Sequence, residues 1–410
     1  MVKKVLIMSA STGGGHNRAA RAIKEELESK TIDGIPVKCE IIDSLKLVNT
    51  TIDKIISTGY EKSAIYTPKA YGRVYRISEA SLMSKNEFKD NILTSYMSQK
   101  LKKLLINSNP DLIIGTHPFP MIALSTLKKS YDENSASSLT ESFHRHNSKV
   151  DVPPMISVLT DYTTHSTWIQ NEIDYYIVGH EYVKELLICE GVNSNKIKPF
   201  GIPVEKSFLS HREKQVVLNE LGLSSDKLTV LLMGGSFGAG NIKETLDELL
   251  SIDRDFQILV ITGKNESLKD KIEKRIASLK HDKTVCILGF TDKMNDILSS
   301  VDLLITKPGG LTTTEALLKD VPMIVPYYIP GQEEENLDFL SNCGAALRTT
   351  KKYSLTVLLK VLIDEPSRLE ILKKNIKSVR KFNSSLNISN LVVDILSDNM
   401  DEENELKKSL

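Results

Sequence analysis

Residues 302–339 combine backbone and side-chain groups that suit a phosphorylated sugar. The chain turns at Pro308, Gly309 and Gly310, and glycines leave bare amides that can approach an anion closely. We expect a helix to follow this turn, with its first-turn amides and its dipole facing the anion. The side chains available to cap that helix are Thr312, Thr313 and Thr314.

Sugar hydroxyls need amide and carboxylate partners, and the same segment supplies them. Glu315 follows the predicted cap, where it is placed to accept hydrogen bonds from a ribose diol. Gln332 and Glu333 stand at the start of a further expected helix and suit the hydroxyls of a hexose. Glycine turns and acid-rich helix starts also occur in α/β proteins without such a ligand, so these residues alone leave both interpretations open.

The amino-acid sequence of this segment resembles that of a known enzyme family. KPGGLTTTEAL and PGQEEEN are similar to the nucleotide-sugar signature of GT-B glycosyltransferases in the processive diacylglycerol glucosyltransferase and monogalactosyldiacylglycerol synthase family. The resemblance covers residues 2–382, except a polar insert at 134–151, to which we assign no function. It implies an α/β fold with two doubly wound, Rossmann-like parallel-sheet domains facing across a cleft.

A second glycine-rich loop, residues 234–240, follows the first strand expected in the second domain. Its amides and a serine hydroxyl would clamp a diphosphate opposite the first turn. Phe290 also follows a strand, where the resemblance implies packing beside uracil, although core packing explains this side chain equally well. The loop residues assigned to UDP-sugar are Gly235, Ser236, Phe237 and Gly238.

In the first domain, the stretch SASTGGGHNRAA places His16 between a strand and a helix. A Walker A loop is excluded because no Lys-Ser/Thr follows the glycines, and the dinucleotide GxGxxG spacing is absent. The helix N-terminus favours neutral His16, the form that a general base requires. A structural histidine is the alternative, but the resemblance implies a catalytic role, with Gly14 and Gly15 on the acceptor side.

Asp161 ends another expected strand of this domain. It could hold the acceptor hydroxyl, orient His16 or act as the base itself, and a simple capping role is equally consistent. The resemblance places three further residues on the acceptor side, although packing explains the first of them as well. These are His117, His165 and Trp168.

Composition limits the alternatives. Lys plus Arg and Asp plus Glu are both 53, so no overall charge favours nucleic acid. Four scattered cysteines indicate neither a zinc site nor a disulfide framework, and no stretch of about 18 apolar residues is present. We expect a cytoplasmic protein, peripheral on the inner face of the cell membrane, with no metal or other cofactor. The acidic pair Asp253 and Asp255 has the Asp-x-Asp spacing of a metal-binding signature, but we interpret it as a solvated turn.

Residues 45–105 hold 11 basic and five acidic side chains, a net charge of +6, with several tyrosines between them. Basic and aromatic residues suit an anionic membrane surface. A solvated helix face with buried tyrosines would show the same composition. The resemblance favours membrane contact, because members of the family reach lipid acceptors through this part of the first domain.

Short apolar runs of strand length recur with helical stretches between them, which indicates two parallel sheets. The first series is 5–8, 39–42, 112–114, 156–159 and 175–178, and the second is 230–233, 258–261, 285–288, 303–305 and 323–325. The predicted divisions are an acceptor and membrane domain at 1–205, a UDP-sugar domain at 206–370, helices at 371–400 that cross back to the first domain, and a frayed acidic tail at 401–410.

The resemblance implies transfer of a hexose, glucose or galactose, from UDP-sugar to diacylglycerol or glycosyl-diacylglycerol with inversion. The alternatives are an N-acetylglucosaminyltransferase acting on lipid-linked muramyl pentapeptide and a UDP-N-acetylglucosamine 2-epimerase. A UDP-sugar sensor that binds without turnover belongs to a different class. Neither the hexose nor the number of sugars added follows from the sequence.

Overall fold

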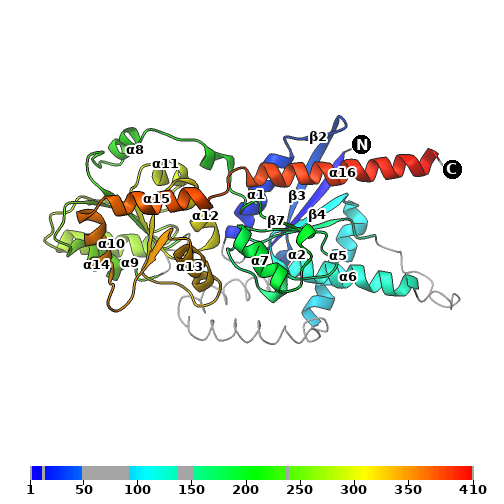
Figure 1. Ribbon diagram of the computed structural model, residues 1–410, viewed down its shortest axis with the longest axis horizontal. Coiled ribbons are helices and arrows are strands. Elements are labelled where there is room, and N and C mark those ends of the chain that lie inside the picture. Colours follow the sequence, from blue (N-terminus) through cyan, green and yellow to red (C-terminus); the bar gives the residue numbers. More distant parts are fainter. Residues whose placement is uncertain (1, 12–13, 49–91, 137–150, 236–239, 409–410) are drawn as a thin grey trace. The chain divides into compact units, whose positions relative to one another are not determined.

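The computed structural model describes residues 2–11, 14–48, 92–136, 151–235 and 240–408 (Figure 1). These residues divide into two compact units. The first unit runs up to Glu205 and resumes at Asn383, and the second runs from Lys206 to Phe382. Each unit is built around its own sheet of mainly parallel strands with helices on both faces, which confirms the predicted α/β class.

The sheet of the first unit has seven strands in the order β2-β3-β1-β4-β5-β6-β7. All neighbouring pairs are parallel except β2 with β3. Val5 lies opposite Cys39 on one side and Leu112 on the other, so β1 is central and buried. The strands are β1 (Lys3–Ser9), β2 (Thr31–Ile32), β3 (Ile35–Asp43), β4 (Leu112–Gly115), β5 (Met155–Val158), β6 (Tyr175–Ile177) and β7 (Ile197–Lys198).

Two helices from opposite ends of the chain cover one face of this sheet. Ile388, Val392 and Leu396 recur every four residues along α16 and join the buried core that α1 and β1 also form. The helices α5, α6 and α7 lie on the opposite face (Figure 1). The helices of this unit are α1 (Gly15–Leu27), α2 (Ser44–Val48), α5 (Ile92–Ser108), α6 (Pro118–Ala136), α7 (Glu181–Cys189) and α16 (Ser384–Lys408).

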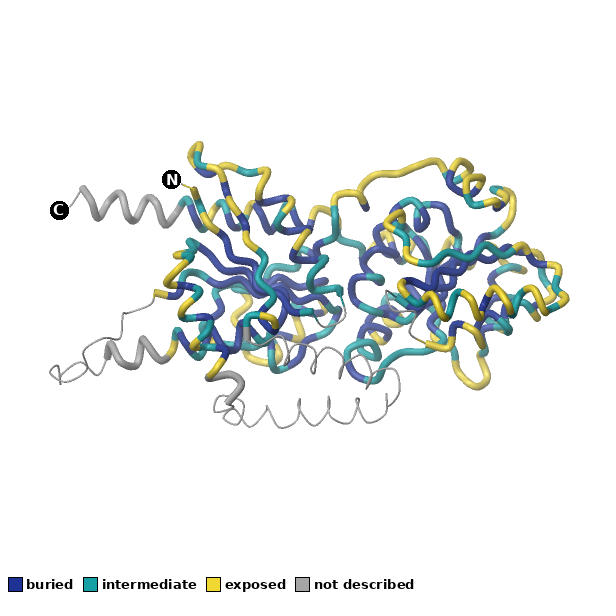
Figure 2. The backbone as a smooth tube through the Cα atoms, turned by 180° about the vertical axis from the view of Figure 1, so that it is seen from behind, coloured by how far each residue is buried: buried dark blue, intermediate teal, exposed yellow. Residues whose placement is uncertain are grey.

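The second unit has a six-stranded sheet in the order β10-β9-β8-β11-β12-β13, with every neighbouring pair parallel. Its four central strands are buried and its edge strands β10 and β13 are less so, whereas the outer faces of its helices are exposed (Figure 2). The strands are β8 (Thr229–Met233), β9 (Gln257–Ile261), β10 (Val285–Leu288), β11 (Leu303–Ile305), β12 (Met323–Val325) and β13 (Ala346–Arg348). The helices are α8 (Lys214–Glu220), α9 (Ile242–Leu250), α10 (Glu266–Ser278), α11 (Met294–Leu298), α12 (Gly310–Leu318), α13 (Gln332–Asn342), α14 (Leu355–Asp364) and α15 (Ser367–Val379).

All ten apolar runs overlap strands, but the sequence analysis missed β2, β7 and β13. These strands have two or three residues, and each mixes apolar with polar residues, so none forms a continuous apolar run. The last helix is also longer than expected, because α16 continues to Lys408 through most of the acidic tail. The Glu, Leu and Lys residues there are good helix formers. Most of the polar insert lies outside the described residues, although α6 reaches its first part.

No described helix is both long enough and apolar enough to pass through a bilayer.

The contribution of α16 to the stability of the first unit can be measured without interference from the second unit. Ile388 has no exposed surface, so Ile388→Ala should lower the free energy of unfolding of the first unit by roughly 2–5 kcal/mol. Trp168 is the only tryptophan and is buried in this unit, so its fluorescence during denaturant unfolding reports the change. Asp394→Ala, at an exposed position of the same helix, is the control. Equal effects of the two substitutions would contradict the packing.

Candidate active site

The strands β1, β4 and β5 are neighbours, and the predicted acceptor-side residues follow their carboxyl ends. Gly14 caps α1 in a left-handed conformation, with φ of 74°, which favours glycine. Gly15 is the first residue of α1, and His16 is the second. The glycine turn therefore sets His16 at the edge of the sheet where doubly wound folds bind ligands.

His16 is held through its Nδ1 atom. This atom lies 2.7 Å from the carbonyl oxygen of Thr116 and 2.9 Å from Oγ1 of Thr160. Because a carbonyl oxygen can only accept, Nδ1 carries the proton and the Thr160 hydroxyl oxygen is a second acceptor. In neutral His16 the Nε2 atom therefore has the lone pair, as a general base requires.

The surroundings of His16 favour this neutral form. Burial lowers the pKa of His16 below its usual value, outweighing the negative charge of Asp161 and the Thr116 carbonyl, which both raise it. Asp161 is only partly buried. The negative charge of Asp161 therefore opposes the effect of burial on His16, and the three roles predicted for Asp161 stay open.

His117 packs edge-on against His16, with 4.7 Å between the ring centroids. Its Nδ1 accepts a hydrogen bond of 3.2 Å from the backbone N–H of Phe119, so that nitrogen is unprotonated. Burial lowers the pKa of His117 well below its usual value, and His16 lowers it further. Two neutral imidazoles therefore lie side by side.

His165 and Trp168 have local structural roles in this arrangement. Nδ1 of His165 accepts the backbone N–H of Thr167 at 3.2 Å and so caps the short helix η1 (Ser166–Trp168). Trp168 is 4% exposed and belongs to the hydrophobic core. Their assignment to the acceptor side stays a prediction.

In the second unit, the glycine turn caps its own helix. Gly309 is the N-cap of α12 and Gly310 its first residue, with no side-chain cap among the described residues. The predicted threonine cap is therefore wrong, because the helix starts two residues before Thr312. Thr314 instead donates a hydrogen bond of 2.8 Å to the Gly310 carbonyl. With no side chain bonded to them, the first-turn amides are available to an anion.

Lys307 is a residue that the sequence analysis did not assign. Its Nζ forms an ion pair with Oε1 of Glu333, whose Oε2 accepts the backbone N–H of Ile329 at 3.0 Å. A Cβ atom at Gly235, where φ is +72°, would lie 3.4 Å from Cε of Lys307. Lys307 therefore lies between Gly235, in the glycine-rich loop at 234–240, and Glu333, the predicted sugar-binding residue. Lys307 is the lysine of the KPGG motif, and this position could have indicated it as a candidate from the sequence.

The remaining donor residues lie on the same unit. Gln332 is the first residue of α13, and Asn336 in the next turn donates a hydrogen bond of 3.0 Å to the Pro308 carbonyl. This bond ties α13 to the glycine turn. Glu315 is buried in α12, at 2% exposure. Three predicted residues, Ser236, Phe237 and Gly238, lie outside the described residues.

Phe290 is 62% exposed, so the core-packing interpretation is wrong. Its ring lines a cavity of about 270 Å³ together with Gly289, Thr291 and Arg212. Nζ of Lys264 lies 5.4 Å from the ring centroid. An exposed aromatic face beside a cavity can stack on a flat ligand such as a base.

The acidic pair Asp253 and Asp255 is exposed, and Asp255 forms a 2.8 Å ion pair with Lys227. This confirms the solvated turn. Within the described ranges, no three His, Cys, Asp or Glu side chains are grouped as ligands for a metal ion.

The tautomer of His16 can be observed directly. Long-range ¹H–¹⁵N correlations should show Nδ1 protonated and Nε2 unprotonated, with protonation only below the usual pKa of 6.5. Because the pKa is lowered on folding, its contribution to stability is complete above pH 6.5 and declines as the pH falls below that value. His16→Gln identifies the signal. An Nε2–H tautomer would contradict the geometry.

The chain matches two family models in succession. Residues 16–140 and 135–204 match the model for monogalactosyldiacylglycerol (MGDG) synthase, and residues 229–386 match the glycosyltransferase family 28 C-terminal domain.

Curated relatives resemble the chain over nearly its whole length. A processive diacylglycerol beta-glucosyltransferase of Bacillus licheniformis is 31% identical over 93% of this chain and 92% of the relative. The protein of the same name from Bacillus pumilus is 30% identical over 96% and 95%, respectively.

Solved structures show the fold. MurG of Acinetobacter baumannii is 15% identical, with a TM-score of 0.59, and covers 95% of this chain and 99% of that one. HepE of Anabaena, solved with UDP, is 12% identical with a TM-score of 0.54 over 96% and 100%. These similarities confirm the GT-B fold. Together with the relatives and the two family models, they show that the chain belongs to the family of diacylglycerol glycosyltransferases related to monogalactosyldiacylglycerol synthase.

Proposed function

We propose that this protein transfers a hexose from a UDP-sugar to diacylglycerol or glycosyl-diacylglycerol, with inversion at the anomeric carbon. The observation that carries the proposal is the neutral His16, with Nδ1 held by Thr116 and Thr160 and Nε2 left as the base. The family supports the acceptor class, because relatives of this length are named diacylglycerol glucosyltransferases.

Catalysis would be a single displacement. Nε2 of His16 takes the proton of the acceptor hydroxyl. At the same time the hydroxyl oxygen attacks the anomeric carbon of the hexose, and the bond from that carbon to UDP breaks. The imidazolium that forms is stabilised by the negative charge of Asp161, which already raises the pKa of His16. His117 excludes water from one side of the His16 ring, so the base stays poorly solvated until the acceptor arrives.

The second unit would hold the donor. The first-turn amides of α12 and the ammonium group of Lys307 meet the diphosphate, whose charge increases as UDP departs. Uracil stacks on Phe290 in the neighbouring cavity, while Gln332 and Glu333 bind the hexose hydroxyls. Support for a UDP-sugar comes from HepE, which has this fold and was solved with UDP-glucose. Glu315 remains the predicted ribose partner.

Reaching diacylglycerol requires contact with a membrane. Of the basic and aromatic region, 49–91 lies outside the described residues, but α5 retains part of it. On this helix Tyr96 is 41% exposed. Lys100 places its Nζ 5.4 Å from the Tyr96 ring centroid. We take this face to be part of a peripheral contact with anionic lipid on the inner face of the cell membrane.

The central test follows lipid-linked sugar after incubation with diacylglycerol vesicles and UDP-glucose or UDP-galactose. His16→Ala should lower kcat by about 100- to 10,000-fold, because the base is lost. Asp161→Asn should also lower kcat, because the imidazolium loses its counter-charge. His281→Ala, in the second unit, is the control.

Near wild-type rates in both His16→Ala and Asp161→Asn would contradict this mechanism. Transfer only to a lipid-linked muramyl pentapeptide would favour the N-acetylglucosaminyltransferase alternative. Binding of UDP-sugar without any transfer would favour the sensor.

Lys307 gives a separate test of the donor site. Lys307→Met should weaken binding of UDP much more than binding of uridine, because only UDP carries the diphosphate. The rate should fall on the order of 100-fold, as when one donor to a developing negative charge is removed. Lys227→Met breaks an ion pair elsewhere in the same unit and is the matched control. Equal losses for UDP and uridine in a calorimetric titration would show that Lys307 does not contact phosphate.

A further inference from the structure

Within the described residues, the chain passes between the two compact units at two places. The first unit ends at Glu205 and the second begins at Lys206, and the return lies between Phe382 and Asn383. We call these the first and the second crossing. When one unit of a protein moves against another, a few residues in such connections change their backbone angles. The bonds around the two crossings therefore decide where the chain can bend.

In the second unit, both crossings are bonded to the end of α12. Lys319 is the C-cap of this helix, and its Nζ donates a hydrogen bond of 2.5 Å to the Ser210 carbonyl, shortly after the first crossing. The next residue, Asp320, forms an ion pair with Arg380, shortly before the second crossing. Two consecutive residues therefore hold the chain on the second-unit side of both crossings.

The segment that follows the first crossing is bonded firmly within the second unit. It begins with the short helix η3 (Lys206–Leu209), which contacts α12 and buries Phe208. Nδ2 of Asn295 in α11 donates a 3.3 Å hydrogen bond to Oγ of Ser210. Lys319 is 7% exposed, so water competes little for its bond to Ser210. This segment therefore moves together with α12.

In the first unit, the start of α16 is bonded to the segment that leads into the first crossing. Oγ of Ser384 donates to the Gly201 carbonyl at 2.6 Å, and Oγ of Ser385 donates to the Val204 carbonyl at 3.4 Å. These bonds join the first-unit sides of the two crossings to each other.

The first crossing also begins beside the helix that carries His16. Oε1 of Glu205 lies 3.9 Å from Nε of Arg18 and 3.7 Å from an Nη atom of Arg21, both on α1. Partly exposed ion pairs of this length contribute little to stability, so the serine bonds carry most of the attachment. The first crossing thus runs from α1, which holds the proposed base, to α12, whose first turn is proposed to meet the diphosphate.

Few residues are left to change their backbone angles. At the first crossing, the bonded residues reach Glu205 on one side and η3 on the other, so bending is limited to their junction. At the second crossing, residues 381–383 lie between Arg380 and Ser384, which are bonded to different units. Asn383 has a left-handed backbone, with φ of 61°, which asparagine tolerates better than most residues. Both bending points are therefore short.

We propose that Lys319 and Asp320 are positioning residues for the transfer reaction, which hold both crossings on α12 and so fix the axis of movement between the units. The proposal rests on the proposed transferase function, in which the two units supply the base and the donor site. Neither residue needs to contact a substrate. Reaction rates respond steeply to such positioning, because a displacement of about 1 Å can lower them on the order of 100-fold.

The distances between the units test this proposal without catalysis. Spin labels are placed at Glu185→Cys and Lys274→Cys, exposed positions of the first and second unit, after all cysteines except the buried Cys39 are replaced by alanine. With UDP at saturation, Lys319→Met and Asp320→Asn should each broaden the distribution of label distances measured by pulsed electron paramagnetic resonance. Asparagine tolerates the φ of 57° at position 320, so the second variant keeps the backbone. Distributions as narrow as that of the wild type in both variants would overturn the proposal.

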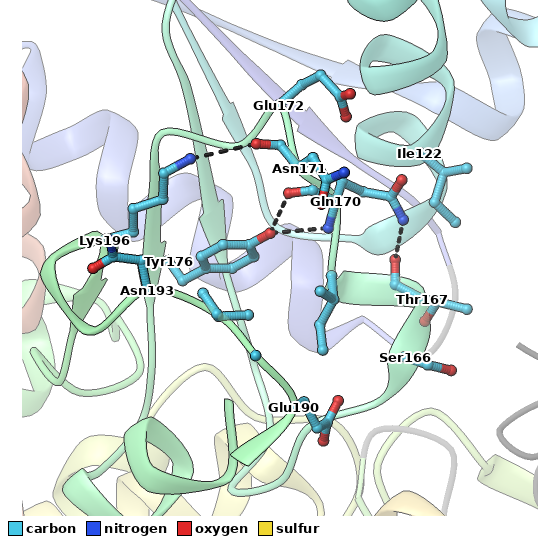
Figure 3. Close-up of a pocket in the computed structure, with 13 residues that line it drawn as sticks. Ile122, Ser166, Thr167, Gln170, Asn171, Glu172, Tyr176, Glu190, Asn193 and Lys196 are labelled. Atoms are coloured by element: carbon cyan, nitrogen blue, oxygen red, sulfur yellow. Dashed lines mark hydrogen bonds between the residues drawn. The ribbon is translucent and has the colours of Figure 1, made fainter. Parts of the chain in front are cut away.

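Two controls remove comparable bonds away from the crossings. Lys196 also donates from Nζ to backbone carbonyls, as Figure 3 shows for Asn171 beside a cavity of the first unit. It precedes β7, whereas the first crossing follows that strand, so Lys196→Met is the matched control for Lys319→Met. Asp247→Asn, which breaks an ion pair inside the second unit, is the control for Asp320→Asn. Both controls should keep the wild-type distribution.

Kinetics then test the consequence for catalysis. Lys319→Met and Asp320→Asn should each lower kcat about tenfold through misplacement, while binding of UDP in a calorimetric titration stays unchanged. Lys319→Arg, which keeps a donor for the Ser210 carbonyl, should recover most of kcat. Weaker UDP binding with an unchanged distance distribution would overturn the proposal, because it would indicate local damage to α12. Absence of transfer by the wild type would instead contradict the proposed function, and the label distances would still decide the role of both residues.

Discussion

The hydrogen bond from Nδ1 of His16 to the Thr116 carbonyl is the interaction on which the proposed chemistry depends. It joins the first turn of α1 to the end of β4, and Thr160 from the end of β5 shares the same proton. Three neighbouring strands therefore determine which imidazole nitrogen is basic. Burial keeps the ring neutral, although the negative charge of Asp161 raises its pKa. The sheet order thus controls a protonation state.

The donor side uses a different electrostatic solution. There the partners proposed for the diphosphate are the backbone amides at the start of α12 and Lys307, which forms an ion pair with Glu333. Glu333, which is predicted to bind the hexose, is also the counter-ion of Lys307. In the proposed mechanism, recognition of the sugar and stabilisation of the leaving group would therefore be coupled. A substitution at Glu333 would affect both.

Much of the fold could be predicted from the sequence, because buried parallel strands appear as short apolar runs. Glycine-rich turns after these runs indicate the carboxyl ends of the strands. This pattern placed His16 and Gly309 after strands, and the family resemblance gave them their predicted roles. The predicted threonine cap at 312–314 was wrong because α12 already begins at Gly310. Gly309 is its N-cap and contributes no side chain. Lys307 and Thr160 were missed because their importance arises from contacts between residues that are far apart in the sequence.

The return of α16 to the first unit has a consequence for biosynthesis. Ile388, Val392 and Leu396 complete a core whose other members come from the first half of the chain. On the ribosome, that core stays unfinished while the entire second unit is made and folds. The apolar surface that α16 will cover, on α1 and the neighbouring strands, is meanwhile open to solvent, so the acceptor-side unit is the later of the two to become stable.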